Sequence, residues 1–521
     1  MNYDYIIVGG GSAGCVLAGR LTEQPDVTVL LLEAGGSDRN FLFHWPAGFA
    51  KMTKGIASWG WSTVPQKHMQ NRVLRFTQAK VIGGGSTINA QLYNRGNALD
   101  FNEWRQLGCE GWSYQDVLPY FKRSEDFERP ADEYHSKGGP LGVSDPRSSL
   151  PICEAFFAAA GQIDIPRNYD FNGESQDGIG YYQLTQKNAL RSSTATGYLK
   201  ERYNLSVKQN SIVRRLMIEK QRVCGVELMD GQIFHANCEV ILTSGAIGSP
   251  KLLMQSGIGP ADHLRSVGID VQHDLPGVGS NLQDHLDLFV ISECTGDHTY
   301  DKYGKPHWAA LAGLQYILTK TGPVASSLFS QGGFWYADEN ARSADIQFHF
   351  GLGSGIEAGV AKMKNAGATL NSAYMRPRSR GTVRLSSNDP GAAPLIDPNY
   401  WADPYDKEMS LRGLRLARDI MNQSALKAFI KSEHLPGANL KTDDELFNYA
   451  CANAKTDHHP VGTCKMGHDD MAVVTPNLKL RGLSGLRICD ASIMPTVVTG
   501  NTNAATIMIA EKAADMIKAS H

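Results

Sequence analysis

The sequence predicts an α/β fold, and three stretches of the chain lead to that prediction. Residues 3–8 form an apolar strand that runs into a glycine turn and then into a helical pattern. Residues 240–259 repeat this order of strand, turn and helix, with the helix expected near Ser249. Residues 485–518 give a short strand that ends at Asp490 and then a long helix that begins near Asn503. Alternating strands and helices are typical of a parallel sheet covered by helices.

The first stretch carries a dinucleotide-binding fingerprint. Gly9, Gly11 and Gly14 have G-x-G-x-x-G spacing between the strand and the helix, where glycines let the backbone approach a pyrophosphate at a helix N-terminus. A second apolar strand ends at Glu33, 19 residues after Gly14, and an acid at this place accepts hydrogen bonds from ribose hydroxyls. We therefore predict a Rossmann-like domain, although this motif alone does not separate FAD from NAD.

A second glycine cluster lies at residues 79–96, AKVIGGGSTINAQLYNRG. The end of an apolar strand is expected at residues 81–82, followed by Gly83 and Gly84 and then by Ser86 and Asn89 as polar groups. This arrangement suits a backbone packed against a large flat ring whose polar edge is hydrogen-bonded. A flexible glycine-rich loop is the alternative interpretation.

The composition sets broad limits on function. The chain has 521 residues, 42% hydrophobic and 20% charged, with a net charge of −2, which gives no electrostatic footprint for nucleic acid. Its nine cysteines contain no CxxC pair, so we expect reduced thiols and a cytoplasmic protein. The N-terminus leaves no room for a signal peptide, and no apolar run approaches the ~20 residues of a membrane span. Peripheral attachment to the inner membrane stays open.

With the segment TDHHPVGTCKMG at residues 456–467, these stretches resemble the glucose–methanol–choline (GMC) family of FAD-dependent alcohol oxidases and dehydrogenases. The resemblance runs from Asp4 to about Lys518 and comprises several long motifs in the right order. Within the family the chain looks similar to choline-dehydrogenase-like members. Its middle region, including GPVASSLFSQGGFWY and RPRSRGTVRL, is similar to L-sorbose dehydrogenases.

The resemblance implies a reaction. Family members transfer a hydride from an alcohol carbon to flavin N5 while a base takes the hydroxyl proton, and the matching base here is His459. The second polar residue of the terminal motif matches Asn503, which we expect to bond the substrate oxygen. An imidazole titrates near 6.5 and can accept a proton at working pH. Where some relatives carry a histidine that binds the flavin covalently, this chain has Ile88, so we predict non-covalent FAD.

The resemblance also implies the residues that contact FAD. In chain order they are Gly9, Gly11, Ser12, Ala13, Gly14, Glu33, Ala34, Gly83, Gly84, Ser86, Asn89, Ala90, Val213, Asp490, Ala491, Asn501 and Thr502. The helix that begins near Asn503 would direct its positive end at the cleft and favour an anionic reduced flavin.

A metal site and a cysteine–histidine nucleophile pair are the two other roles open to these histidines. A metal site built from His458, His459, Cys464 and His468 has no recognised ligand spacing, so we predict no metal. A Cys464–His459 nucleophile pair would need an acyl-transfer constellation that the sequence lacks, so Cys464 is expected to be a packing residue. Because adjacent residues of an extended segment point in opposite directions, only His459 is expected to face the flavin, and His458 is left with a cleft-lining or structural role.

The family pattern implies a discontinuous chain organisation. Residues 1–150, 190–295 and 455–521 are expected to form the FAD-binding domain. Residues 151–189 and 296–454 would form a substrate domain, an antiparallel sheet flanked by helices. Residues 345–353 and 380–387 are expected to be strands of that sheet, and an amphipathic helix is expected from Lys407. The tryptophan-containing residues 39–65 would either cover the cleft or pack in the core.

The leading hypothesis is a FAD-dependent oxidoreductase that converts a primary alcohol, such as a polyol or sugar, to the aldehyde. An oxygen-dependent oxidase of aryl, furanic or choline-type alcohols in the same family is the alternative. The electron acceptor is either oxygen or a quinone or cytochrome-type carrier. A NAD-dependent dehydrogenase would leave the second glycine cluster and the terminal motif unexplained, and a non-catalytic flavin scaffold would not need His459.

Overall fold

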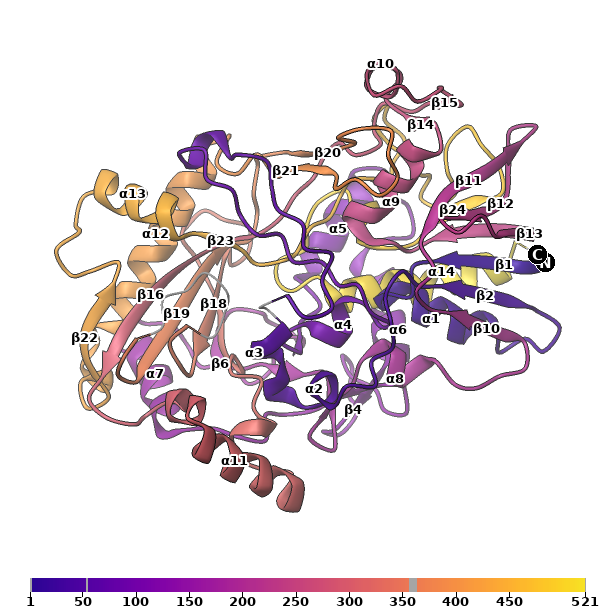
Figure 1. Ribbon diagram of the computed structural model, residues 1–521. Coiled ribbons are helices and arrows are strands. Elements are labelled where there is room, and N and C mark those ends of the chain that lie inside the picture. The colour runs from indigo at the N-terminus through magenta and orange to yellow at the C-terminus, as the bar shows by residue number, and fades with distance from the viewer. Residues whose placement is uncertain (1, 53–54, 356–362, 521) are drawn as a thin grey trace.

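A computed structural model describes residues 2–52, 55–355 and 363–520 of the chain. Two seven-stranded sheets form its framework, one toward each end of the molecule in Figure 1, with both chain termini at the end that holds the first sheet. The predicted mixed α/β architecture, with a second antiparallel sheet flanked by helices, is confirmed.

The first sheet is mainly parallel, with the strand order β10-β2-β1-β13-β12-β11 and with β24 beside β13. Its strands are β1 (Asn2–Val8), β2 (Val29–Leu32), β10 (Leu205–Lys208), β11 (Val213–Glu219), β12 (Arg222–Leu228), β13 (Ile233–Leu242) and β24 (Leu486–Ile488). β1 pairs in parallel with β2 on one side and β13 on the other. All four residues of β2 are buried, which explains an unbroken apolar run where one-sided exposure would give alternation.

Three helices follow the predicted glycine turn, crossover and C-terminal motif. They are α1 (Ser12–Leu21), α9 (Gly245–Gln255) and α14 (Asn503–Lys518), so α14 begins where the sequence predicts and α9 begins earlier than expected. The strand end expected at residues 81–82 is reduced to a single bridge between Gly36 and Val81.

The second sheet is antiparallel, with the order β22-β16-β19-β18-β17-β6 and with β23 beside β16. Its strands are β6 (Gly178–Tyr181), β16 (Leu286–Cys294), β17 (Gln331–Trp335), β18 (Ile346–Gly351), β19 (Gly367–Tyr374), β22 (Ile430–Leu435) and β23 (Lys455–Thr456). Helix α12 (Pro404–Met421) packs on β16 and β19, as the pattern from Lys407 predicts. The second expected strand is not part of this sheet, because β20 (Thr382–Arg384) pairs with β21 (Leu395–Asp397) as a separate ribbon.

Two of these strands lie in segments that we assigned to the FAD-binding part. β16 and β23 fall within residues 190–295 and 455–521, yet both belong to the antiparallel sheet. The chain therefore enters the second sheet directly after Asp284 and His285, and it leaves that sheet two residues before His458. The two crossings are adjacent because Leu286 pairs with Thr456.

The shorter elements complete the described chain. The remaining helices are α2 (Phe41–His44), α3 (Phe49–Met52), α4 (Gly85–Ile88), α5 (Ala98–Gln106), α6 (Tyr114–Ser124), α7 (Pro151–Gly161), α8 (Thr194–Tyr198), α10 (Ala261–Ser266), α11 (Pro306–Thr319) and α13 (Asp443–Asn453). The remaining strands are β3 (Leu92–Tyr93), β4 (Glu125–Phe127), β5 (Leu141–Val143), β7 (Gln183–Leu184), β8 (Gln186–Lys187), β9 (Leu190–Arg191), β14 (Ile258–Gly259) and β15 (His273–Asp274). None of the helices in the described part of the chain is long and apolar enough to cross a bilayer.

A buried carboxylate ties α14 to its neighbours. The side chain of Glu511 is 0% exposed and is paired with Arg20 at 2.9 Å and with Arg123 at 2.7 Å. The hydroxyl of Tyr198 donates a third bond to it at 2.6 Å. A fully buried carboxylate needs such partners because desolvating an ion is expensive.

Replacing Glu511 by alanine should destabilise the protein by about 3–5 kcal/mol, because two guanidinium groups then lose their buried counter-ion. The measurement is the midpoint of chemical denaturation of the FAD-loaded protein. Asp515→Ala is the matched control: it removes another partner of Arg123, but the Asp515 side chain is 46% exposed, so we expect at most about 1 kcal/mol. Equal losses in both variants would contradict the assignment of Glu511 as the anchor of α14.

Candidate active site

Glycines bring three backbone segments into close contact at the carboxyl end of the parallel sheet. A Cβ atom on Gly14 would lie 1.9 Å from the carbonyl oxygen of Gly9, and one on Gly84 would lie 2.6 Å from the Cα of Gly11. Gly9 has a φ of +109°, which side chains rarely adopt. Gly11 gives α1 no side-chain cap, so the amides of its first turn are available to an anion.

Glu33 closes the far end of this glycine cradle. Its two carboxylate oxygens accept hydrogen bonds from the backbone N–H groups of Gly10 at 2.8 Å and Gly35 at 2.7 Å. Burial raises the pKa of Glu33 to about 7, although these two bonds oppose the shift. The carboxylate therefore shapes the turn as well as lining the cavity where we expected it to meet a ribose.

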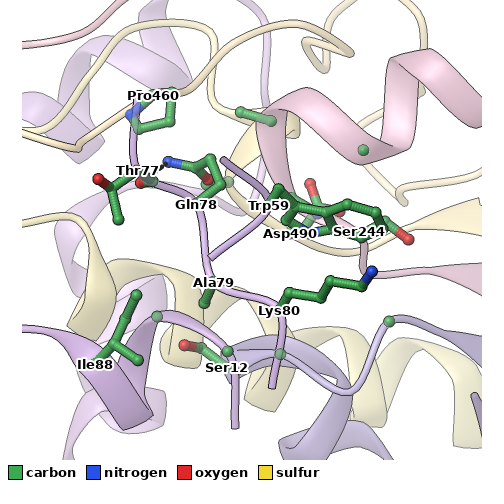
Figure 2. Close-up of a pocket in the computed structure, with 18 of the residues that line it drawn as sticks. Ser12, Trp59, Thr77, Gln78, Ala79, Lys80, Ile88, Ser244, Pro460 and Asp490 are labelled. Atoms are coloured by element: carbon green, nitrogen blue, oxygen red, sulfur yellow. Dashed lines mark hydrogen bonds between the residues drawn. The ribbon is translucent and has the colours of Figure 1, made fainter. Parts of the chain in front are cut away.

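A large cavity, about 660 Å³, runs between the glycine cradle and the antiparallel sheet. That volume is in the range of small-molecule sites. Figure 2 shows Ser12, Ile88, Lys80 and Pro460 around the same opening, although they come from distant parts of the chain. The expected contact residues that line it are Gly9, Gly11, Ser12, Ala13, Glu33, Ala34, Gly84, Asn89, Ala90, Val213, Asp490, Ala491, Asn501 and Thr502, together with His459 and Asn503.

Three of the expected contact residues do not line the cavity. Gly14 and Gly83 are packed against backbone or side chains, since a Cβ on Gly83 would lie 2.1 Å from the Thr87 hydroxyl. The hydroxyl of Ser86 donates to the carbonyl of Gly83 at 2.6 Å and lies 3.0 Å from the Thr194 hydroxyl. These residues support the turn, and their direct contact with the cofactor stays a prediction.

His459 lies at the junction of the two sheets and is only 8% exposed. Its backbone N–H donates to Asp284 at 2.7 Å, and Asp284 also accepts a bond from the Thr456 hydroxyl at 2.5 Å. Burial and the neighbouring histidines hold the pKa of His459 well below its usual value. The ring is therefore neutral at ordinary pH and can accept a proton.

The protonation pattern of His459 follows from its partners. His285 Nε2 lies 3.1 Å from the carbonyl oxygen of Met375 and must donate to it, because a carbonyl only accepts. Burial lowers the pKa of His285 to about 4, so this ring is neutral and its Nδ1 is an acceptor. His459 Nδ1, 3.1 Å away, then carries the hydrogen of the shared bond. That leaves His459 Nε2 unprotonated.

Asn501, and not Asn503, is the amide beside the base. Asn501 Nδ2 lies 3.2 Å from His459 Nε2. The other end of the amide is fixed, because Gln347 Nε2 donates to Asn501 Oδ1 at 3.0 Å. Asn503 Nδ2 instead donates to the Ser12 hydroxyl at 2.8 Å, which joins the first residues of α14 and α1. The expected position of Asn503 next to His459 is therefore corrected.

His458 also lines the cavity, in agreement with the cleft-lining role left open for it, although the expected alternation is absent. The residue has a φ of +61°, so the segment turns at this point and is not extended. Its backbone N–H donates to the Thr456 hydroxyl at 2.9 Å, which closes the turn. As a result Asp457, His458 and His459 all face the same cavity.

Polar strand residues line the cavity opposite the glycine cradle. His349 on β18 pairs in register with Asn371 on β19, and both line the cavity. Behind them Asp287 is fully buried and accepts bonds from Lys455 Nζ at 2.8 Å and Asn371 Nδ2 at 2.9 Å. In the part of the chain described, His349 Nε2 is buried without a hydrogen-bond partner. This wall of the cavity thus carries an imidazole and an amide side chain, and the carboxylate behind them is already neutralised by an ammonium group.

The rejected metal and thiol sites are not assembled. Cys464 is fully buried and does not line the cavity, and all nine cysteines are free. Within the described residues, the one group of three ligand-type side chains with atoms within 4.8 Å of one another is Asp287, His349 and Asp457. The ammonium of Lys455 already occupies an oxygen of Asp287, so the prediction of no metal is retained as a prediction.

Sequence reasoning missed His285 and Gln347. His285 sits one residue before β16 and acts through a contact that spans 174 positions in the chain, so no local pattern could indicate it. Gln347 could have been found: the strand at residues 345–353 was recognised, and period-two alternation places positions 347 and 349 on one face. The alternation pattern was present, but the sequence did not show that Gln347 contacts Asn501, which is 154 positions away in the chain.

Comparison with known proteins agrees with this geometry. Family models described as GMC oxidoreductase match residues 3–287 and 377–510. An oxygen-dependent choline dehydrogenase of Paraburkholderia xenovorans is 43% identical over 530 residues, covering 99% of this chain and 94% of that protein.

Solved structures extend the likeness to the whole fold. Pyridoxine 4-oxidase from Mesorbium loti has a TM-score of 0.91 at 31% identity, with 100% of both chains covered. A formate oxidase variant of Aspergillus oryzae, solved for the effect of its mutation on FAD modification, has a TM-score of 0.94 at 27% identity, with 100% of this chain and 98% of that chain covered. The curated relatives are choline dehydrogenases, and the expected likeness to sorbose dehydrogenases is not among these findings. The chain belongs to the GMC oxidoreductase family and is a FAD-dependent alcohol oxidoreductase.

Proposed function

We propose that this protein oxidises a primary alcohol to the aldehyde, with His459 as the general base. The observation that carries the proposal is the hydrogen-bonded series from Met375 through His285 to His459. It leaves His459 Nε2 unprotonated, and a base must have such an atom within reach of the hydroxyl proton. The Asn501 amide donates to this nitrogen at 3.2 Å, and the substrate hydroxyl would replace that donor. FAD, when bound, accepts the hydride that leaves the alcohol carbon.

Asn501 is proposed as the donor to the substrate oxygen. Its amide nitrogen has two hydrogens, and one of them is directed at His459 Nε2. The second is available to the alcohol oxygen, where it would stabilise developing negative charge without competing for the proton. Gln347 prevents the amide from flipping, because a flipped Asn501 would place two N–H groups against each other.

The residues that line the cavity fit FAD. Gly9, Gly11 and Gly84 line the cavity with backbone alone, and the open amides at the start of α1 suit a pyrophosphate. The first turn of α14 lines the same cavity, so its positive end would favour an anionic flavin ring. Ile88 lines the cavity with an unreactive side chain, and we therefore propose that FAD is held without a covalent bond.

The charge of the substrate end favours a neutral alcohol. Asp287 is bonded to Lys455 and Asn371, so this carboxylate is not available to pair with a cationic substrate. A quaternary ammonium substrate such as choline, suggested by the relatives, would then depend on other groups. Hydroxyl groups of a polyol or sugar are better matched to the uncharged polar side chains that line this end, which include Asn371 and Asn501.

The proposed function predicts turnover of neutral primary alcohols above turnover of choline. A panel of polyols, L-sorbose, aryl alcohols and choline would be assayed once under air and once anaerobically with an artificial electron acceptor. Oxygen is the proposed acceptor, because the similar proteins include an oxygen-dependent choline dehydrogenase and pyridoxine 4-oxidase. Choline as the preferred substrate, or turnover only with the artificial acceptor, would overturn the corresponding half of this proposal.

His459→Ala should slow anaerobic flavin reduction by about 10²–10⁴-fold, because the hydroxyl proton then has no positioned acceptor. Asn501→Ala should cost about 10²–10³-fold, as for the loss of one oxyanion donor. Stopped-flow absorbance of the flavin measures both rates.

Asn503→Ala is the matched control for the two asparagines of this motif. It removes the bond to Ser12 and should weaken FAD retention while leaving the reduction rate of bound flavin within about tenfold of wild type. A larger rate loss for Asn503→Ala than for Asn501→Ala would reverse the assignment. Unaltered reduction in His459→Ala would remove the proposed base.

Non-covalent binding predicts that acid precipitation releases the flavin. The supernatant should be yellow and the protein pellet colourless, because no bond joins the ring to position 88. Ile88→His provides a comparison, since it restores a nucleophile at the place where some family members attach the flavin. A yellow pellet from the wild-type protein would contradict the proposal.

A further inference from the structure

Helix α11 exposes an unusual amount of apolar surface. Only Ala312 and Tyr316 of its fourteen residues are buried. Five large apolar side chains are between 38% and 73% exposed, and they are Trp308, Leu311, Leu314, Ile317 and Leu318. Figure 1 shows α11 at the edge of the molecule, projecting away from both sheets. Contiguous apolar surface of this kind marks an interaction site in a folded protein.

The apolar face continues onto the N-terminal part of the chain. Trp45 packs against Tyr316 with ring centroids 5.2 Å apart, and Phe41 packs against Trp45 at 4.7 Å. Phe41 is itself 55% exposed. A few residues further on, Phe49 and Met52 line the active-site cavity. The exposed surface and the cavity are therefore connected by one short segment.

Basic residues surround this face. Lys302 and Lys305 precede the helix and Lys320 follows it, and residues 302–337 contain no Asp or Glu. The ammonium of Lys302 lies 5.4 Å from the centre of the Trp308 ring, and that of Lys320 lies 4.7 Å from the centre of the Tyr316 ring. An apolar face with tryptophan and lysine at its margin matches the boundary between acyl chains and anionic headgroups.

We propose that α11 is an interfacial anchor that binds the surface of an anionic phospholipid bilayer. Fourteen residues extend about 21 Å, which is too short to cross a ~30 Å hydrocarbon core, so the helix lies parallel to the membrane plane. A second copy of the chain is a poorer partner. A two-fold interface would set this face against itself, and the lysines of one copy would then be brought toward those of the other.

The test is sedimentation of the purified FAD-loaded protein with sucrose-loaded vesicles. Vesicles of phosphatidylglycerol and phosphatidylethanolamine should bind the protein, and vesicles of phosphatidylcholine alone should bind it more weakly. The triple variant Leu311→Gln, Leu314→Gln, Leu318→Gln should lose at least about tenfold in affinity, because three apolar side chains no longer enter the interface. The triple variant Lys302→Gln, Lys305→Gln, Lys320→Gln should lose about fivefold per lysine on anionic vesicles.

Matched controls exist elsewhere on the surface. Val207, Ile233 and Leu395 are 41% to 44% exposed, and their triple replacement by glutamine should leave vesicle binding unchanged. Exposed Lys137, Lys220 and Lys427 provide the corresponding charge control. Retention of bound FAD in every variant reports that it has folded.

Three results would overturn the proposal. The first is no binding of the wild-type protein to anionic vesicles, and the second is equal losses in the α11 variants and their controls. The third is a wild-type dimer in sedimentation velocity that the leucine variant converts to a monomer, without any vesicle binding. That outcome would make the face a contact between two copies of the chain.

Discussion

The bond between the Nδ1 atoms of His285 and His459 is the interaction on which the active site depends. It joins the start of the antiparallel sheet to the C-terminal part of the chain, and burial keeps both rings neutral by lowering their pKa values. A neutral pair can share only one hydrogen, and the carbonyl of Met375 decides its direction. One acceptor thus determines which nitrogen of His459 is free to act on a substrate.

The supports of this pair come from the antiparallel sheet and from the loops beside it. Asp284 fixes the backbone of His459, and the same carboxylate accepts bonds from Thr456 and Tyr400. Gln347 on β18 orients Asn501 from the opposite side. Strands are rigid compared with loops, so donors mounted on them hold a site to a narrow range of geometry. The turn at His458 has a positive φ, and it is held by the bonds from the His458 and His459 backbone N–H groups to Thr456 and Asp284.

Features that depend on neighbouring positions could be predicted from the sequence. The strand, glycine turn and helix at residues 3–21, Glu33 at the end of β2, and the start of α14 at Asn503 all follow from spacing and periodicity. The cavity position of His459 followed from the family resemblance. These predictions succeeded because each motif has to meet the same large ligand, which restricts residue type and spacing together.

The failures share one physical cause: each required knowing where the backbone turns or which distant strand is adjacent. Asn501 and Asn503 are two positions apart, and the start of α14 rotates one toward His459 and the other toward Ser12. Both positions have the same asparagine side chain, and nothing in the sequence shows how the backbone rotates between them. The expected alternation at His458 was wrong because a single residue of positive φ changes the direction of an extended segment. A catalytic motif can therefore be recognised from sequence before the role of each residue in it is known. The chemistry restricts the residue types, whereas the local direction of the backbone decides which residue faces the base.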